Sequence, residues 1–266
     1  MTDEPEKKPY YICSCSGGKD SVATIILAHE HNEPLDEIIF CEVMFDENIS
    51  GELPEHIDFI YNVLKPKCEE WGYKFTIVRG EKNYIDLFHR RKQRALKKEN
   101  EWKVGLMLGF PLQKGCFIRN YCKIAPIERY LKQISPGGVH QYLGIAYDEV
   151  RRLKTMHERN NATSLLEKYK HTEAMASWLC RKHGLLSPYY KYQKRGGCWF
   201  CPNARFEEFY RLYKEHNDLF MALLKLEQES EGERECVWFR SLAKETFSNI
   251  YRKCLYKDGQ GDLFDD

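Results

Sequence analysis

Six consecutive residues near the start of the chain have the composition of a phosphate-binding loop. They read Ser16-Gly17-Gly18-Lys19-Asp20-Ser21 and follow the short apolar run Tyr11 to Cys15. Glycines let backbone N–H groups approach an anion closely, and the positive end of a following helix favours negative charge. Such a helix, packed against a sheet, is predicted by the apolar spacing of Val22, Ile25, Ile26 and His29. The expected order is therefore a strand, a phosphate-binding loop and a helix.

Two pairs of cysteines have the spacing of metal ligands. Cys198 and Cys201 are separated by two residues, which lets both thiolates face one ion, and Cys116 and Cys122 form a looser pair upstream. Four thiolates suit either tetrahedral zinc or a [4Fe–4S] cluster, and we favour the cluster. Cys180 is an alternative to Cys116 as a ligand. The other interpretation of the upstream pair is that one of its thiols is a small buried hydrophobe.

The elements that must position these residues are those of an α/β protein. Residues Glu37 to Phe45 form a continuous apolar segment of the kind found in buried parallel strands, and Tyr73 to Arg79 predicts another strand. Between them, the apolar spacing from Pro54 to Gly72 predicts a helix that Pro66 kinks or divides. This order predicts a doubly wound, mostly parallel sheet, with the loop and Asp46 at the edge where ligands bind.

The second half of the chain predicts fewer strands. Residues 124–134 indicate a helix and residues 139–145 a strand, which leads into a charged exit that contains Glu149, Arg151 and Arg152. Beyond about residue 160 the pattern indicates helices, at 206–227 and 237–256. We therefore expect an α/β nucleotide-binding domain at 1–160, a helical part at 161–256 that completes the four-cysteine site, and a flexible tail at 257–266.

Composition excludes some classes of protein. The 266 residues carry a net charge of only +1 although 30% of them are charged, so no global field marks a nucleic-acid coat or a membrane-surface protein. No apolar run could span a bilayer and the first residues are polar, so we expect a cytoplasmic protein without membrane contact. The basic run from Tyr84 to Lys103 either grips a phosphate backbone or is a solvated face, and the second interpretation is the commoner one.

Taken together, these landmarks resemble the PAPS reductase-like family of the PP-loop ATP pyrophosphatase superfamily. The loop is similar to its Ser-Gly-Gly-x-Asp-Ser motif, and further similar segments are Phe45-Asp46 with Leu53-Pro54-Glu55, Cys122 to Pro126, Gly144 to Arg152, and Gly197 to Pro202. The resemblance implies a Rossmann-like fold that holds ATP by its pyrophosphate portion and transfers AMP. It also implies that Ser16 to Ser21 bind ATP. We expect Lys19, Asp20 and Asp46 to be catalytic, with both aspartates positioning Mg²⁺, and Glu149, Arg151 and Arg152 to be candidates for holding the acceptor. Each arginine could equally form a surface ion pair.

Departures from the family pattern bear on the activity. Residues 257–264 lack the cysteine of the Glu-Cys-Gly-x-His tail that sulfonucleotide reductases carry. We therefore expect an ATP-dependent adenylating enzyme that serves sulfur transfer to a nucleic acid or nucleotide, with DNA or tRNA as acceptor and a sulfur donor protein as partner. The alternatives are a PAPS or adenylyl-sulfate reductase and a non-catalytic nucleotide or nucleic-acid binding module. Residues Gln260 to Phe264 also resemble a sliding-clamp peptide, although motifs this short often arise by chance.

Overall fold

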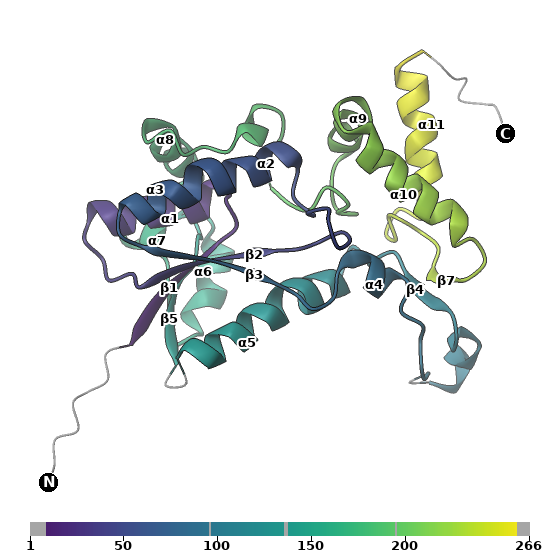
Figure 1. Cartoon of the computed structure of the whole chain (residues 1–266), viewed down its shortest axis with the longest axis horizontal. Coiled ribbons are helices and arrows are strands. Elements are labelled where there is room, and N and C mark those ends of the chain that lie inside the picture. The colour runs from purple at the N-terminus through teal and green to yellow at the C-terminus, as the bar shows by residue number, and fades with distance from the viewer. Residues whose placement is uncertain (1–8, 96, 136–137, 195, 260–266) are drawn as a thin grey trace, which may run out of the picture. The chain divides into compact units, whose positions relative to one another are not determined.

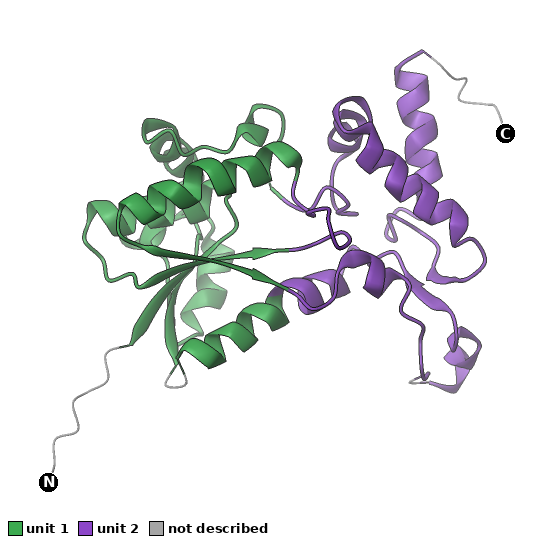
Figure 2. Ribbon diagram, in the orientation of Figure 1, with its two compact units in different colours: residues 1–42, 53–79, 124–196 green, residues 43–52, 80–123, 197–266 purple. Residues whose placement is uncertain are grey.

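A computed structural model describes residues 9–95, 97–135, 138–194 and 196–259 (Figure 1). The chain divides into two compact units that alternate along the sequence (Figure 2). Unit 1 comprises residues 1–42, 53–79 and 124–196, and unit 2 comprises residues 43–52, 80–123 and 197–266. We expected domain boundaries at residues 160 and 256. These boundaries stay a prediction, because the two compact units do not test them.

Unit 1 contains a five-stranded sheet in which every pair of neighbours is parallel. Its strands lie in the order β3-β2-β1-β5-β6, with the bounds β1 (Tyr10–Cys15), β2 (Glu37–Glu42), β3 (Lys74–Arg79), β5 (Val139–Tyr142) and β6 (Ala162–Thr163). All six residues of β2 are buried, as its continuous apolar pattern predicts for a strand covered on both faces. The chain moves outward from β1 in both directions, so the expected α/β class with a doubly wound parallel sheet is confirmed.

The helices of unit 1 pack against this sheet; Figure 1 shows α3 on one side of β2 and β3 and α5 on the other. Their bounds are α1 (Lys19–Glu30), α2 (Pro54–Phe59), η1 (Ile60–Leu64), α3 (Lys65–Glu70), α5 (Ala125–Ile134), α6 (Val150–His157), α7 (Leu165–Lys168), α8 (Glu173–Lys182) and η4 (Pro188–Lys191). Helix α1 is buried on all sides from Ser21 to Ala28, because α7 and α8 cover the surface that the sheet does not. Its apolar pattern alone predicted only one buried face.

The helix from Pro54 changes to a π-helical form one turn before the proline that was predicted to kink or divide it. Residues Ile60–Leu64 form a π-helical segment between α2 and α3, and Pro66 lies in the first turn of α3. Proline has no N–H and its ring clashes with the carbonyl of the residue four positions earlier, so a wider turn there accommodates it. The helix therefore continues to Glu70 without a non-helical break.

Unit 2 is mainly helical and includes a parallel pair of short strands, β4 and β7. Its elements are α4 (Tyr84–Phe88), η2 (Lys98–Lys103), β4 (Met107–Gly109), η3 (Arg119–Ile124, whose last residue belongs to unit 1), α9 (Phe206–Glu215), α10 (Asn217–Glu229), β7 (Arg234–Cys236) and α11 (Phe247–Lys257). The helix expected at 237–256 begins only at Phe247, because Thr246 caps it and the carboxylate of Glu227 accepts hydrogen bonds from the amides of Phe247 and Ser248.

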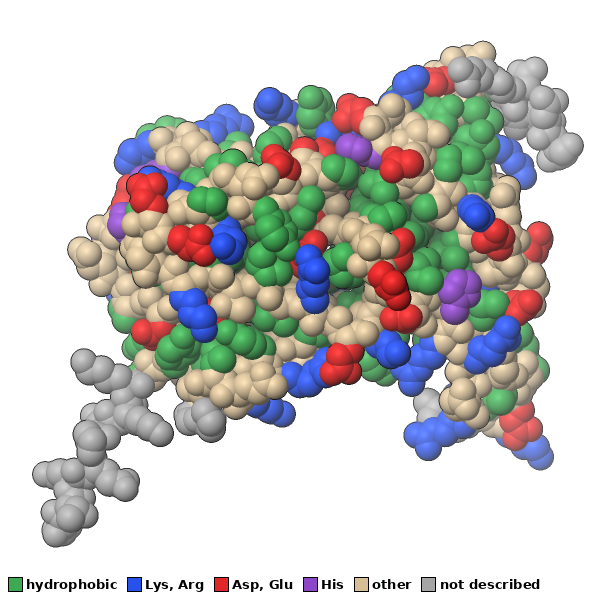
Figure 3. All heavy atoms as spheres, viewed as in Figure 1, with side chains coloured by type: hydrophobic (Ala, Val, Ile, Leu, Met, Phe, Trp, Pro, Cys, Tyr) green, Lys and Arg blue, Asp and Glu red, His purple; other side chains and the backbone are tan. Residues whose placement is uncertain are grey.

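The basic run in unit 2 is paired with acids of β7 and the residue before it. Arg91 lies 2.6 Å from Glu233, and Lys92 and Lys103 lie 2.9 and 3.4 Å from Glu235. Figure 3 shows charges of both signs scattered over the face in view, as the small net charge implies. None of the helices in the described ranges combines the length and the apolar composition that a membrane crossing needs.

One buried carboxylate ties the sheet of unit 1 to α5. Glu37 in β2 is fully buried and accepts hydrogen bonds from Tyr10 (3.0 Å), from Tyr130 of α5 (2.6 Å) and from Thr76, while Lys74 lies 3.1 Å away. Burial alone would raise the pKa of Glu37, but the bonds from Thr76 and Tyr130 outweigh it, so the pKa lies below its ordinary 4.5.

Replacement of this carboxylate, Glu37→Gln, should therefore lower stability in a pH-dependent way. A depressed carboxyl pKa stabilises the fold above the unfolded value and loses that effect as pH falls through the folded value. We expect the variant to lose on the order of 2 kcal/mol of unfolding free energy at neutral pH, and less at pH about 3.5. Urea unfolding at both pH values measures this. The exposed Glu70→Gln should change stability by less than about 1 kcal/mol, and an equal loss at both pH values would contradict the role of charge.

Candidate active site

The glycine loop leaves β1 and enters α1 in a conformation that only glycine adopts easily. Gly17 has a φ of +70°, and a Cβ there would come within 2.6 Å of the imidazole of His56. That imidazole is buried, with Nε2 3.0 Å from the carbonyl oxygen of Ser16 and Nδ1 2.7 Å from the hydroxyl of Ser187. Because a carbonyl can only accept, Nε2 donates to Ser16, and Nδ1 is held by a hydrogen bond with the hydroxyl of Ser187. His56 therefore braces the backbone of the loop.

The backbone amides of the loop donate to neutral acceptors. The amide of Ser16 donates to Ser21 Oγ (3.2 Å), that of Gly17 to Cys15 Sγ (3.3 Å) and that of Gly18 to Ser16 Oγ (3.4 Å). The amide of Lys19, the first residue of α1, donates to the hydroxyl of Tyr190 (2.9 Å). A thiol and three hydroxyls are weaker acceptors than a phosphate oxygen, so an anion could displace them with a gain in hydrogen-bond strength. Successive amides at a helix N-terminus are suited to that exchange.

Charged groups gather beside the first turn of α1. Lys19 Nζ lies 3.0 Å from Asp20 and 2.7 Å from Glu173, the first residue of α8. Burial alone would lower the pKa of Lys19, but its bonds to Glu173 and Asp20 outweigh this and raise it. Burial raises the pKa of Asp20 in spite of Lys19, and the carboxylates of Glu173 and Glu149 add to the increase. This excess of carboxylates would be relieved by a cation.

The segment after β5 lies against the loop, as the topology requires. A Cβ on Gly144 would come within 2.7 Å of the amide nitrogen of Ser21, so the two backbones approach closely. β1 and β5 are neighbours while β2 lies on the other side of β1, which makes this the topological switch point where ligands of such sheets bind. The loop and the β5 exit, both predicted from sequence, are thus brought together.

The residues predicted to hold the acceptor have different surroundings. Glu149 accepts from the amide of Ala146 (3.0 Å) and pairs with Arg152 at 2.6 Å. The side chain of Arg152 is half exposed beyond this pair, and Arg151 is exposed. Glu149 therefore fixes its own loop and the start of α6, and the two arginines remain accessible to an anionic group. Their role as acceptor ligands stays a prediction.

Asp46 belongs to unit 2, whereas the glycine loop belongs to unit 1. Its Oδ1 accepts from the amides of Asn48 (2.8 Å) and Ile49 (2.7 Å), so the carboxylate closes the turn that follows β2. The neighbouring Phe45 packs against Trp199 at 4.7 Å between ring centroids. The contribution of Asp46 to a Mg²⁺ site stays a prediction.

All four predicted cysteine ligands lie in unit 2. The turn from Cys198 to Cys201 is closed by a backbone bond of 2.9 Å and anchored by two buried rings between the cysteines, Trp199 and Phe200. Trp199 donates its ring N–H to the carbonyl of Ser50 (2.8 Å), and Phe200 packs on Tyr84 at 4.4 Å between centroids. These contacts fix the turn against residues 43–52.

The other cysteines differ in their surroundings. Cys116 accepts from the amides of Ile118 and Arg119, and burial nevertheless raises its pKa. The thiol of Cys122 is buried and lies 3.2 Å from the carbonyl oxygen of Lys82. Cys180, the alternative ligand, is buried inside unit 1, where its thiol donates to the carbonyl of Lys19 (3.2 Å). Throughout the described ranges, no three side chains of metal-binding type converge on one point.

A buried hydroxyl near Cys116 and a buried guanidinium near Cys236 nevertheless suit an anionic metal centre. The hydroxyl of Tyr84 and two guanidinium nitrogens of Arg234, Nε and Nη1, are buried and have no hydrogen-bond partner among the described residues. Burial first, and then the nearby thiols of Cys116 and Cys236, raise the pKa of Tyr84. Donors left unsatisfied in a protein interior are costly, and thiolate sulfur is an acceptor that would satisfy them. The donor set therefore suits a thiolate-bound metal group.

Three residues of the site gave no signal in the sequence. His56, Tyr190 and Glu173 lie 40, 171 and 154 positions from the loop residues that they contact. A lone histidine, tyrosine or glutamate in a helical pattern has no spacing that marks it. The only usable hint was the place of His56 directly after Leu53-Pro54-Glu55, at the start of a helix.

Comparison with known proteins gives few matches. No family model matches the chain. An uncharacterized protein of Methanocaldococcus jannaschii is 26% identical over 233 residues, which cover 80% of this chain and 49% of that protein. The chain thus spans about half the length of this curated relative.

Two solved structures are similar. A phosphoadenylyl-sulfate (PAPS) reductase from Candida auris, in its phosphate complex, has a TM-score of 0.44 and 12% identity over 73% of this chain and 83% of that one. The U34-tRNA thiolase NcsA from Methanococcus maripaludis, with its [4Fe–4S] cluster, has a TM-score of 0.38 and 15% identity over 96% and 73%. Both TM-scores lie below 0.5.

The bracing of the loop by His56 predicts a specific cost for Gly17→Ala. A left-handed backbone costs a non-glycine residue about 1–2 kcal/mol, and the clash with the imidazole adds about 1–3 kcal/mol. Gly184→Ala is the matched control, because Gly184 has a φ of +68° and open space where its Cβ would lie. Denaturant unfolding of both variants should show the larger loss for Gly17→Ala. Equal losses would mean that His56 does not constrain the loop.

Proposed function

We propose that the chain is an ATP-dependent adenylating enzyme that releases pyrophosphate and so prepares a nucleic acid or nucleotide for sulfur transfer. The observation that carries this proposal is the row of loop amides from Ser16 to Lys19, which ends at the N-terminus of α1 and is held by neutral acceptors. In the proposed complex, the β- and γ-phosphates of ATP replace these acceptors on Gly17, Gly18 and Lys19, and the hydroxyls of Ser16 and Ser21 donate to phosphate oxygens.

The charges beside α1 suit the same ligand. Lys19 would exchange its carboxylate partners for phosphate oxygens and neutralise part of their charge. Asp20 would then be free to help position Mg²⁺, a hard ion that prefers carboxylate and phosphate oxygens. Burial raises the pKa of Asp20, and a bound cation would favour its charged form again.

The proposed reaction occurs at the α-phosphorus. An acceptor oxygen attacks this atom, a new oxygen–phosphorus bond forms, and the bond to the oxygen that bridges to the β-phosphate breaks. Pyrophosphate leaves, and the loop donors stabilise the charge that develops on it. A sulfide nucleophile from a sulfur donor protein then attacks the activated carbon or phosphorus, and AMP departs with the former acceptor oxygen. Arg151 and Arg152 are proposed to hold a phosphate of the acceptor, DNA or tRNA, with Glu149 orienting Arg152.

For the cysteines, we propose a metal group held by Cys116, Cys122, Cys198 and Cys201, with a [4Fe–4S] cluster favoured over zinc. A cluster would carry or deliver sulfur, whereas zinc would be structural. Tyr84 and Arg234 are proposed to donate to its sulfur atoms, which would satisfy their buried groups. The sliding-clamp peptide predicted at Gln260 to Phe264 lies outside the described residues.

The adenylation proposal is tested by substitution of Lys19 and Asp20. We expect the wild type to release pyrophosphate from ATP with a DNA, tRNA or nucleotide acceptor, and Lys19→Ala and Asp20→Asn to lower turnover about 100-fold or more. Lys65→Ala, which removes only a surface pair with Glu69, is the control and should retain full turnover.

Other outcomes of that assay identify the alternatives. ATP binding without pyrophosphate release on any acceptor would support a nucleotide-binding module instead. Thiol-dependent reduction of a sulfonucleotide would support a reductase. Undiminished turnover in Asp20→Asn would remove this carboxylate from the mechanism.

The metal proposal is tested by anaerobic purification followed by iron, zinc and sulfide analysis. We expect iron and sulfide in the wild type and their loss in Cys198→Ser, because the turn supplies two ligands. Cys254→Ala is the control, since Cys254 is a buried residue of α11 outside the predicted set. Zinc without sulfide would favour the structural alternative, and a wild type with neither metal contradicts the proposal.

A further inference from the structure

A basic pocket lies at the start of α11 in unit 2, within one compact part of the chain. It has a volume of about 500 Å³ and is lined by Arg240, Ala243, Lys244, Glu245, Asn249, Arg252 and Lys253. Four cations and one carboxylate leave an excess of three positive charges, although the whole chain carries only +1. Positive charge is therefore far more concentrated at this pocket than over the protein as a whole.

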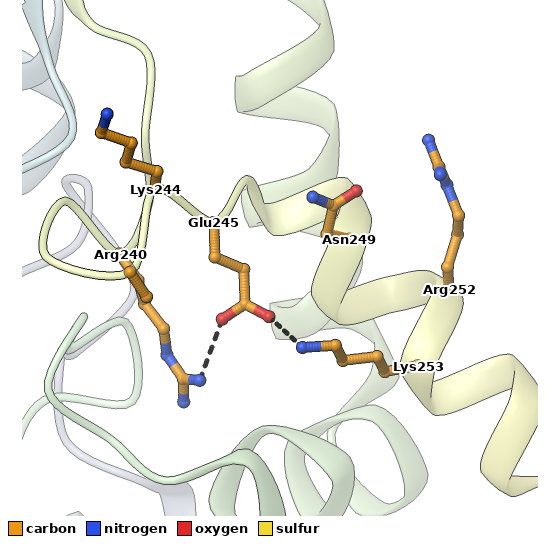
Figure 4. A pocket seen from close by; sticks show the side chains of 7 residues that line it. Arg240, Lys244, Glu245, Asn249, Arg252 and Lys253 are labelled. Carbon is orange, nitrogen blue, oxygen red and sulfur yellow. Dashed lines mark hydrogen bonds and ion pairs between the residues drawn. The ribbon is translucent and has the colours of Figure 1, made fainter. Parts of the chain in front are cut away.

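The single carboxylate is already shared by two of the cations. Glu245 is buried and lies 3.0 Å from Arg240, and Lys253 binds its other oxygen at 2.5 Å. Figure 4 shows Arg240 and Lys253 converging on Glu245, while the side chains of Lys244 and Arg252 extend away from it. Both of these are exposed, and neither forms an ion pair with another described residue. Two cations are thus left to meet an external anion.

The backbone of α11 does not provide the anion site. The amides of Phe247 and Ser248 donate to the buried carboxylate of Glu227 at 2.6 and 2.7 Å, and that of Asn249 donates to Thr246. The helix N-terminus is therefore already occupied by a carboxylate of the chain itself. An anionic ligand of the pocket must be held by side chains, and those that could donate to it are the cations and the amide of Asn249.

The backbone near Lys244 is also unusual. Lys244 has a φ of +49°, a left-handed conformation that a non-glycine residue rarely adopts, and it stands between Arg240 and Glu245, whose backbones pair across the turn. Lys244 is the last residue of this turn. Strain of this kind is common where a side chain is presented to a ligand.

We propose that this pocket binds phosphate groups of a nucleic-acid backbone. Arginine and lysine at an open rim suit phosphate oxygens, which remain charged at neutral pH and are spaced along a strand so that several cations can be engaged at once. The ring of Trp238, 37% exposed in the segment that precedes Arg240, offers a face for base stacking. This proposal deepens the proposed function, because it assigns the surface of this chain that would bind the acceptor. It rests on the proposed function only in saying what the bound strand is used for.

The test is the binding of labelled single-stranded DNA and RNA oligonucleotides to the whole chain, measured by fluorescence anisotropy at several salt concentrations. We expect Lys244→Ala combined with Arg252→Ala to weaken binding at least about fivefold and to reduce the slope of log affinity against log salt by about 1–2. Lys65→Ala combined with Lys67→Ala changes the net charge equally at a surface of unit 1 and should leave binding unchanged. Lys244 and Arg252 are exposed, whereas Lys65 and Lys67 are partly exposed, and circular dichroism checks the folding of both double variants.

Every other outcome has a defined meaning. Equal weakening in both double variants would show only a general effect of net charge and overturn the proposal. Binding of inorganic phosphate but of neither oligonucleotide would overturn it as well, as would undiminished binding in Lys244→Ala/Arg252→Ala. A preference for DNA or for RNA supports it and identifies the backbone.

Assays on the same protein preparation distinguish a failure of this proposal from a failure of the proposed function. Lys19→Ala should lose pyrophosphate release and retain oligonucleotide binding. If the wild type releases no pyrophosphate but the pocket variant still binds oligonucleotides more weakly than its control, the adenylation proposal fails and the pocket stands. If turnover on a nucleotide acceptor is normal and no oligonucleotide binds, only the pocket proposal fails.

Discussion

The candidate nucleotide site depends on the approach of one imidazole to one glycine. His56 occupies the space where any side chain at position 17 would lie, and it holds the carbonyl of Ser16 through Nε2. With that carbonyl fixed and Gly17 in a left-handed conformation, the amides that follow turn toward the start of α1. Ser187 holds the other ring nitrogen, so both the tautomer and the orientation of the imidazole are set by the fold.

This arrangement leaves no amide from Ser16 to Lys19 unsatisfied. The partners of these amides are a thiol and hydroxyls, and their exchange for phosphate oxygens would gain charge-assisted bonds. Tyr190 is central here, because its hydroxyl takes the amide of Lys19 that would otherwise be unpaired. The carboxylates of Asp20 and Glu173 act in the same way, since they hold the ammonium of Lys19 where the phosphate oxygens of the proposed complex would meet it.

The sequence was sufficient where structure depends on neighbours along the chain. Two glycines between an apolar run and a helical pattern determine the turn from β1 to α1, and the continuous apolar run of β2 determines a strand buried on both faces. It was insufficient where contacts join distant segments. Burial of α1 on all sides depends on α8, some 150 residues later, and β6 and β7 have two and three residues, too few for any periodicity. His56 and Glu173 were missed for the same reason, because nothing local distinguishes them from structural residues.

Packing determines where the turn from Cys198 to Cys201 lies. The spacing of these two cysteines predicts two ligands, and the pair of rings between them fixes the position of the two thiols. Trp199 and Phe200 are buried against Phe45 and Tyr84, and the indole N–H is bound to Ser50. Asp46 closes the turn that begins at Phe45, so the aspartate and the thiols are attached to the same group of rings. Because such a group of rings is densely packed, it fixes the positions of the cysteine turn and of the turn that Asp46 closes within unit 2.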